Sequence, residues 1–393
     1  MAMRISRIYL KNWMNFREAD VGELADVVYV LGANAAGKSN LLEAIRFVRD
    51  LAKTRGGGLQ QAIESRGGIK KIRCLHARKD TEVVVALQIA DDELSAKWSY
   101  EIAFNLPGSG HREPQVVRET VKRTNSSGGE SILLERPDKK DKQDSFLLRE
   151  TSLEQASANA EFRDLASFLG SVSYVHLVPQ LLKFGDQIGG RVLEDDPFGQ
   201  EFLFRIARTQ ARTRDARLRR VEKALQAVVP QLEDLQFVKD EITGQPHLEM
   251  RFKHHRPRGA KQREDQFSDG TLRIIALLWL MQESGGGPLL LEEPELSLNE
   301  DVVRQLPELF SRIVKSQKTK RQIILTTHSE ALLSNPGINS DSLLLVIPSD
   351  EGSQLRKTSE QENNALSVGL SPGEVVLPVV RKANKALQLT LDL

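Results

Sequence analysis

The chain has 393 residues, and its 55 lysines and arginines nearly balance 54 aspartates and glutamates, which leaves a formal net charge of +1. This balance gives no global attraction to nucleic acid, and the single cysteine, Cys74, excludes a disulfide framework within one chain. Neither an N-terminal signal segment nor an apolar stretch long enough to span a membrane is present, so we expect a cytoplasmic protein of two or three lobes without membrane contact.

The first informative motif is a complete G-x-x-x-x-G-K-S phosphate-binding loop, Gly32-Ala33-Asn34-Ala35-Ala36-Gly37-Lys38-Ser39. The apolar run 27–31 before it predicts a buried strand, and apolar residues recur at helical spacing over 41–51. Between a strand and a helix, the backbone N–H groups of such a loop cradle phosphates. Lys38 would reach the β- and γ-phosphates, and Ser39 would supply a hydroxyl to Mg²⁺. The motif therefore predicts an ATP and Mg²⁺ site.

The middle of the chain divides into blocks. Alternating runs predict an antiparallel β-lobe beside the nucleotide, with strands at 81–90, 97–104, 115–122 and 131–135. Polar composition predicts loops at 124–130 and 138–144. Further along, we expect a strand at 173–178, two helices within 197–229, and a hairpin that turns at 243–246 between strands 235–241 and 248–252.

Two basic clusters lie in this middle part, Arg205 to Lys223 and Lys253 to Arg263. They favour contact with a nucleic-acid backbone or with an acidic protein surface. The alternative is a solvated helix face followed by a basic loop near ATP. His254 and His255 lie in the second cluster, but no nearby carboxylate or cysteine stands at ligand spacing, so we expect no metal site there.

A second anion-binding segment and a pair of carboxylates come later in the chain. Ser268 and Gly270 precede the apolar helix 274–281; because the chain already has a phosphate loop, we expect this helix start to serve the γ-phosphate of a second subunit. The apolar strand 288–291 ends in Glu292 and Glu293. Glu292 would hold Mg²⁺, and Glu293 would act as general base on the water that attacks the γ-phosphate. The alternative is a buried strand followed by a solvated acidic turn.

Two motifs complete the series. The turn 295–299 is suited to crossing a dimer interface, and His328 ends the strand 323–327, where it would touch the γ-phosphate and sense its loss. Each motif alone is common, but their order and spacing together predict that they act at one nucleotide site.

The order of GANAAGKSN, FSDGTLR, LLLEEPELSLN and LTTHS resembles the ABC-type ATPase heads of the RecF/SMC class, closest to the compact AAA-labelled ATPases beside RecF and the OLD family. The opening segment, residues 4–16, and Asn40 are also typical of that class. The resemblance implies that Ser268 and Gly270 are signature residues, that 297–299 is the D-loop, and that His328 is the switch histidine. It makes Gln180 a candidate Q-loop ligand of Mg²⁺, although a strand-end polar residue fits equally well.

The resemblance covers 1–55 and 265–350 well and the middle in outline, and it implies an α/β P-loop NTPase of ABC type with an antiparallel β-lobe and an inserted helical lobe. We expect an N-terminal ATPase lobe at 1–180, a helical insert and hairpin at 181–265, and a C-terminal ATPase lobe at 266–393. The stretch between Gly37 and Ser268 is too short for long coiled-coil arms, and the segment after His328 is too short for a Toprim nuclease domain.

Two subunits would then sandwich two ATP molecules, and hydrolysis would open the homodimer. The compactness of the chain and the absence of a fused effector favour a sensor or switch in an antiphage or toxin-controlling system with a separately encoded effector protein. The alternative is a DNA-repair or recombination ATPase that clamps DNA through the basic cluster at Arg205 to Lys223. The opening segment and the SDGTLR motif argue against a transporter subunit.

Overall fold

The computed structural model describes residues 3–53, 55–91, 96–108, 113–124, 128–190, 192–253, 261–283, 287–316 and 321–386. His254 and His255 lie outside these ranges. Among the described residues, no helix combines the length and the apolar character needed to cross a membrane.

One six-stranded sheet, here called the P-loop sheet, carries the nucleotide motifs. Its strands lie in the order β15 (Gln354–Arg356), β14 (Leu343–Ile347), β3 (Val27–Leu31), β13 (Ile323–Thr327), β12 (Leu289–Glu292) and β8 (Ser173–Val175). All neighbours are parallel except β15, which runs antiparallel to β14. Because parallel strands end at one edge, the residues that follow β3, β12 and β13 meet there.

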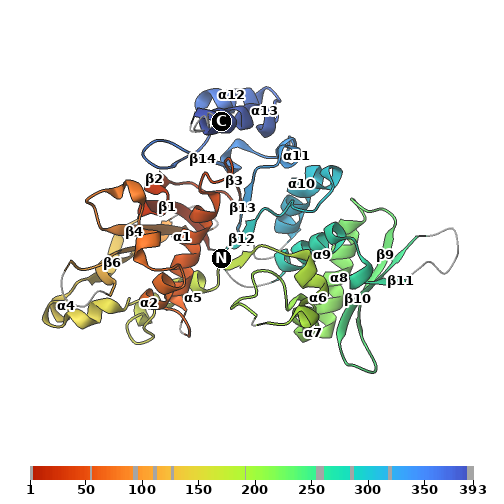
Figure 1. Cartoon of the computed structure of the whole chain (residues 1–393), viewed down its shortest axis with the longest axis horizontal. Helices are drawn as coiled ribbons and strands as arrows, with labels where there is room; N and C mark the ends of the chain where they lie inside the picture. The colour runs from red at the N-terminus through yellow and green to blue at the C-terminus, as the bar shows by residue number, and fades with distance from the viewer. Residues whose placement is uncertain are drawn as a thin grey trace, which may run out of the picture.

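The two faces of the P-loop sheet belong to different cores, because successive side chains of a strand point to opposite faces. Val28 and Val30 pack in one core with helix α1 (Lys38–Ala52) and the β-lobe. Tyr29 and Leu31 pack in the other core with α9 (Asp269–Met281), α10 (Glu300–Ser316) and α11 (Glu330–Leu333). Figure 1 accordingly draws α1 and α9 on opposite flanks of β12 and β13.

The β-lobe is a second six-stranded sheet in which all neighbours are antiparallel. Its order is β2 (Phe16–Val21), β1 (Arg4–Trp13), β4 (Val83–Ala90), β5 (Ala96–Asn105), β6 (Gln115–Thr124) and β7 (Glu130–Arg136). The strands predicted between 81 and 135 are therefore confirmed. Buried Gln322 joins the two sheets: its amide donates to the carbonyls of Ile5 at 2.8 Å and Ala25 at 3.0 Å and accepts from the Ile5 N–H at 2.9 Å.

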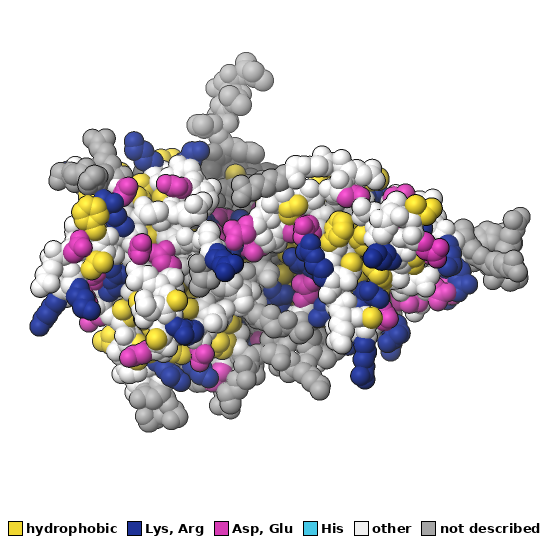
Figure 2. All heavy atoms as spheres, turned by 90° about the horizontal axis from the view of Figure 1, so that it is seen from below, with side chains coloured by type: hydrophobic (Ala, Val, Ile, Leu, Met, Phe, Trp, Pro, Cys, Tyr) yellow, Lys and Arg dark blue, Asp and Glu magenta, His cyan; other side chains and the backbone are white. Residues whose placement is uncertain are grey.

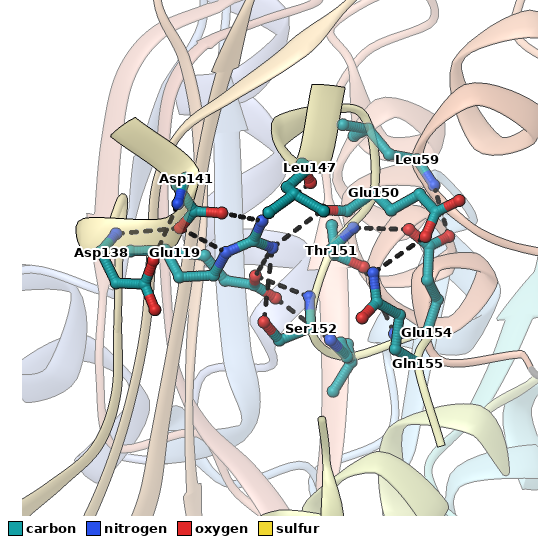
Figure 3. A network of polar contacts seen from close by, with 12 residues as sticks. Leu59, Glu119, Asp138, Asp141, Leu147, Glu150, Thr151, Ser152, Glu154 and Gln155 are labelled. Carbon is teal, nitrogen blue, oxygen red and sulfur yellow. Dashed lines mark hydrogen bonds and ion pairs between the residues drawn. The ribbon is translucent and has the colours of Figure 1, made fainter. Parts of the chain in front are cut away.

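Buried charged side chains form a network of hydrogen bonds and ion pairs where β7 ends (Figure 3). Arg136 donates to Asp141 at 2.7 and 3.0 Å and to Glu119 at 3.2 Å. Asp141 belongs to helix α4 (Lys139–Gln143), which Asp138 caps through a reciprocal capping box. The predicted loop at 138–144 is therefore wrong. Its charged residues form a helix because Asp138 satisfies the first N–H groups and Arg136 pairs with Asp141 in the interior.

Glu154 lies beside this network and ties it to the short helix α2 (Leu59–Glu64), which precedes α3 (Ile69–Ile72). Its carboxylate accepts the Thr151 N–H at 2.5 Å and the Leu59 N–H at 3.1 Å. Burial raises the pKa of Glu154 to about 7, against the lowering effect of these two N–H groups.

The helical lobe consists of α6 (Pro179–Ile188), α7 (Phe202–Arg208), α8 (Ala211–Leu225) and a three-stranded sheet of order β11 (Lys261–Arg263), β10 (Pro246–Phe252) and β9 (Leu232–Lys239). The two predicted helices and the hairpin are confirmed, and Gly244 turns the hairpin with a φ of 72°. The predicted strand at 173–178 ends early, at Val175, because the N–H groups of His176 and Val178 donate to the carbonyls of Pro197 at 2.8 Å and Phe198 at 3.1 Å. Helix α5 (Arg163–Gly170) packs on α1, and α12 (Glu360–Ser367) and α13 (Pro372–Ala386) form the C-terminal end (Figure 1).

Candidate nucleotide site

The phosphate loop joins the end of β3 to the start of α1, as the sequence predicts. Gly37 has a φ of 107°, and a Cβ there would lie 1.9 Å from the amide nitrogen of Asn15, so this position requires glycine. Lys38 is buried and curls back over the loop, where its ammonium donates to the carbonyls of Gly32 at 2.9 Å and Ala33 at 3.0 Å. Phosphate oxygens of a bound nucleotide could take the place of both carbonyl oxygens as acceptors for this ammonium.

Two residues without an assigned role in the sequence brace this loop from outside. Asn15 donates to the Ala36 carbonyl at 2.7 Å and accepts from the Asn40 amide at 2.8 Å. Ser353 donates to the same Ala36 carbonyl at 2.6 Å. Asn15 lies within the opening segment 4–16, but the sequence singled out neither Asn15 nor Ser353.

Glu292, at the end of β12, connects the phosphate loop to the neighbouring strand β8. The Ser39 hydroxyl donates to one oxygen of its carboxylate, and the Tyr174 hydroxyl donates to the other. Tyr174 comes from β8, and the guanidinium of Arg46 on α1 lies 3.9 Å from the centre of its ring. Burial, followed by the bond to Glu292, raises the pKa of Tyr174, so the phenol stays protonated and is a donor. Sequence analysis missed Tyr174 because no motif surrounds it.

Glu293 turns away from Glu292 and pairs with His328. Its φ of 42° breaks the strand, and its N–H donates to the Thr326 hydroxyl at 3.2 Å. The carboxylate lies 2.9 Å from Nδ1 of His328, which directly follows β13. The two residues named as general base and switch histidine are therefore brought together at the sheet edge that also holds Ser39 and Glu292.

Carboxylates and cations lie close together at this edge of the sheet. Burial lowers the pKa of Lys38, while Glu293, Glu295 and Glu292 oppose that shift. Burial raises the pKa of Glu295, which accepts a bond from Thr327 and has a second carboxylate oxygen with no hydrogen-bond partner among the described residues. Arg273 also interacts electrostatically with Glu295 and Glu293, so Lys38 is not the only cation beside these carboxylates.

The donor set fits Mg²⁺. A serine hydroxyl and carboxylate oxygens are hard ligands, and Mg²⁺ is held by one or two protein groups together with substrate phosphates. Among the described residues there is no group of three or more His, Cys, Asp or Glu side chains that could hold a metal ion by itself. Ser39 and Glu292 would hold the ion.

The signature segment lies on the other face of the P-loop sheet. Ser268 caps α9 by accepting the Thr271 N–H at 3.1 Å, and a Cβ on Gly270 would lie 2.8 Å from the carbonyl of Ser297 in the D-loop. Signature and D-loop thus pack together within one chain. Because α1 and α9 belong to different cores, Ser268 does not share a face with the phosphate loop of its own chain.

Gln180 is the second residue of α6, and its amide lies 3.4 Å from Asp269, which also pairs with Lys183 at 2.6 Å. The structure therefore places Gln180 against the signature helix, and its part in binding Mg²⁺ stays a prediction. Arg273, another residue without a predicted role, is buried in α9 and donates to the Glu293 carbonyl at 3.0 Å. This bond joins the signature helix to the carboxyl end of β12.

Most basic residues of the first cluster contact other parts of the chain, chiefly α9 and the two residues that follow it. Arg205 pairs with Glu283, Arg208 with Glu201, and Arg220 donates to Gln282. Arg217 is buried and lies over the Trp279 ring. Within this cluster, the exposed cations without a partner among the described residues are Arg212, Arg219 and Lys223. The second cluster lies largely outside the described residues, and Arg263 pairs with Asp240 and Glu249.

Comparison with known proteins shows what the chain is similar to. Two sequences of the DNA replication and repair protein RecF align with short stretches of the chain: that of Chlamydia caviae is 49% identical over 52 residues and that of Chlamydia abortus 40% over 62 residues. These alignments cover 13% and 16% of this chain and only 14% and 17% of the RecF sequences.

Solved structures of SMC heads match over nearly their whole length. An SMC head bound to the C-terminal winged-helix domain of ScpA has a TM-score of 0.50 at 15% identity and covers 91% of this chain and 99% of that one. A Pyrococcus furiosus SMC head with an extended coiled coil, bound to the C-terminal domain of ScpA, gives 0.50 at 13% identity with 93% and 98% coverage.

The sequence model of one family matches residues 27–334, most of the chain. Its description is an AAA domain, putative AbiEii toxin, type IV TA system. The chain therefore belongs to this AAA family and has the ABC-type P-loop ATPase fold of the RecF/SMC class, as the sequence predicts.

Proposed function

We propose that the chain binds ATP with Mg²⁺ and hydrolyses it. The observation that carries this proposal is the meeting of Ser39, Glu292, Glu293 and His328 at one edge of the P-loop sheet. Lys38 would exchange its two carbonyl contacts for phosphate oxygens, and Mg²⁺, when bound, would neutralise charge on the β- and γ-phosphates. Glu293 would accept the proton of the attacking water, and His328 would hold its carboxylate in place.

Lys38→Ala tests this activity directly. Removing the ammonium leaves the backbone N–H groups alone to neutralise the phosphates, so we expect ATP affinity to fall about 10- to 100-fold, the worth of a hydrogen bond to a charged group. Equilibrium binding of a fluorescent ATP analogue measures this. Wild-type ATP affinity in the variant would contradict the assignment of residues 32–39 as the phosphate-binding loop.

We further propose that two copies complete each other's sites. Ser268 and Gly270 form an anion-binding helix start on the face opposite α1, so a γ-phosphate held by one copy would be met by the signature of its partner. Binding would close the dimer and hydrolysis would open it, which turns nucleotide state into a conformational signal.

The biological role we favour is a sensor or switch that acts with a separately encoded effector in an antiphage or toxin-controlling system. The family description supports it, since it names a putative AbiEii toxin and a type IV TA system. Co-purification of the chain from its native operon, with and without ATP, tests the role. An ATP-dependent partner encoded beside it is expected, and a chain that recovers nothing in either state would contradict the proposal.

A DNA-clamping ATPase is the second candidate, and a specific surface favours it. Arg212, Arg219 and Lys223 stand at helical spacings of 7 and 4 residues, so they form one exposed stripe on α8. The RecF alignments point the same way. Against it, Figure 2 shows basic side chains on the helical lobe interspersed with acidic and apolar ones, which weakens any field that would attract a phosphate backbone.

A further inference from the structure

We propose that Tyr174 is a positioning residue that orients the Glu292 carboxylate and thereby sets the Mg²⁺ requirement of nucleotide binding. This inference rests on the proposed nucleotide site and adds a group that no phosphate-binding motif contains. Tyr174 would touch neither the ion nor ATP, and it would act entirely through Glu292.

The geometry of two parallel strands places the tyrosine where it can do this. Tyr174 on β8 is in register with Leu290 on β12, so its side chain leaves the same face of the sheet as those of Leu290 and Glu292. Its hydroxyl donates to the Oε2 atom of Glu292, while Ser39 donates to Oε1. The carboxylate is therefore held by one oxygen on each side, and its plane is fixed.

A glutamate at this position needs such a support more than an aspartate would. The additional methylene gives Glu292 one more torsion, whose freedom is lost when the carboxylate is held in one orientation. The Ser39 hydroxyl would be a ligand of the ion itself, so its bond to Oε1 would not be available as a lasting support of the carboxylate. The bond from Tyr174 lies on the other oxygen and can stay in place throughout.

The tyrosine is itself held by the phosphate-loop helix. The Arg46 guanidinium lies 3.9 Å from the ring centre, and Arg46 also pairs with Glu43 one turn earlier on α1 at 2.5 Å. A cation over the ring face draws electron density from the phenol, which makes the hydroxyl a stronger donor. Ser39, Arg46 and Tyr174 therefore join α1, β8 and the end of β12 around a single carboxylate.

Tyr174→Phe keeps the ring and its contact with Arg46 and removes only the hydroxyl. The measurement is equilibrium binding of a non-hydrolysable ATP analogue titrated with Mg²⁺, so no turnover is needed. We expect the Mg²⁺ concentration for half-maximal binding to rise about tenfold, the effect of losing one hydrogen bond to a charged group, with Mg²⁺-free binding unchanged. Arg46→Met should shift it in the same direction by less.

Tyr100→Phe is the matched control. Tyr100 is fully buried and its hydroxyl donates to the Glu119 carboxylate at 3.2 Å, in the β-lobe network. Its loss should lower the midpoint of thermal unfolding and leave the Mg²⁺ titration as in the wild type. An equal Mg²⁺ shift in both variants would mean that general destabilisation causes it, and the positioning role would be wrong.

A double-mutant cycle separates action through Glu292 from any other effect. The shorter side chain in Glu292→Asp cannot reach both Ser39 and Tyr174, so adding Tyr174→Phe should produce little further Mg²⁺ shift. Fully additive shifts of the Mg²⁺ midpoint would contradict the positioning role of Tyr174, and so would an unshifted titration for Tyr174→Phe in the wild-type background. Neither result would contradict the proposed nucleotide site. A wild-type protein whose nucleotide binding shows no Mg²⁺ dependence would instead contradict the proposed function.

Discussion

Nδ1 of His328 lies 2.9 Å from a carboxylate oxygen of Glu293, and this pair separates the two adjacent glutamates at the end of β12. On a regular strand Glu292 and Glu293 would point to opposite faces. The positive φ of Glu293 and the histidine on the neighbouring strand instead bring Glu293 to the sheet edge, while Glu292 faces Ser39. The two adjacent carboxylates therefore have different partners, the hydroxyls of Ser39 and Tyr174 for Glu292 and the imidazole of His328 for Glu293.

Glu293→Gln should separate binding from chemistry. The amide keeps the size of the side chain but cannot accept a proton from water, so we expect ATP and Mg²⁺ to bind as in the wild type while turnover falls at least about 100-fold. Single-turnover hydrolysis and equilibrium binding measure the two steps. The control is Glu308→Gln, which makes the same change on the exposed face of α10. Wild-type turnover in Glu293→Gln would remove Glu293 as general base.

The stability of the β-lobe should depend on pH through Glu154. Its folded-state pKa of about 7 lies above the ordinary carboxyl value, so the folded chain holds this proton more tightly than the unfolded chain. The stability associated with this group is therefore fully present below the unfolded pKa and is lost as the pH rises through about 7. Urea unfolding at about pH 5 and about pH 8 measures it.

The variant Glu154→Gln removes this titration while keeping one of the two acceptors for Thr151 and Leu59. The free energy of unfolding of the wild type, relative to that of the variant, should decrease between the two pH values. Glu300→Gln, an exposed change on α10, should give a constant difference. A constant difference for Glu154→Gln as well would mean that Glu154 does not titrate in this range.

The sequence predicted correctly where the phosphate loop, the strand before Glu292 and the start of the signature helix lie in the fold, because each of these features is local. The phosphate loop, the strand before Glu292 and the cap at Ser268 each need only the spacing of a few consecutive residues. The groups that support them come from distant segments: Tyr174 reaches Glu292 from the neighbouring strand of the sheet, and Ser353 meets the phosphate loop from the far end of the chain. Such contacts depend on sheet order, which one sequence does not reveal.

The same limit explains the wrong loop at 138–144. Its composition is typical of a solvated segment, but Arg136 lies in the interior and requires a partner, which Asp141 supplies. It also explains why the basic cluster at Arg205 to Lys223 presents fewer unpartnered cations on the surface than its sequence suggests. Its residues Arg205, Arg217 and Arg220 turn toward Glu283, Trp279 and Gln282.

Charge reversal of the α8 stripe tests nucleic-acid binding. If the stripe contacts a phosphate backbone, changing Arg212, Arg219 and Lys223 to Glu should abolish the salt-dependent part of DNA affinity and leave ATP turnover largely intact. A matched control reverses Arg304, Arg312 and Arg381, which are exposed on α10 and α13 and change the net charge equally. Equal losses in both triple variants would show that net charge, not this stripe, governs the contact.

The composite site makes a prediction about mixtures of two inactive variants. Lys38→Ala removes the phosphate contact of one chain, and Ser268→Arg places a bulky cation where the signature would meet its partner's γ-phosphate. Each homodimer should be inactive, because both of its sites carry a defect. In a mixed dimer, one site pairs an intact phosphate loop with an intact signature, and the other site carries both defects.

Mixing the two chains should therefore restore ATPase activity, up to about half of the wild-type rate per mixed dimer if one site fires alone. Steady-state hydrolysis measured against mixing ratio, at constant total protein, should pass through a maximum near equal amounts. Mixing Lys38→Ala with Glu293→Gln is the control: both residues belong to the phosphate-loop side, so every site in that mixture lacks one of them and activity should stay absent. Hydrolysis by Ser268→Arg chains alone at the wild-type rate would show that the signature is not needed, and each chain would then be an independent P-loop ATPase.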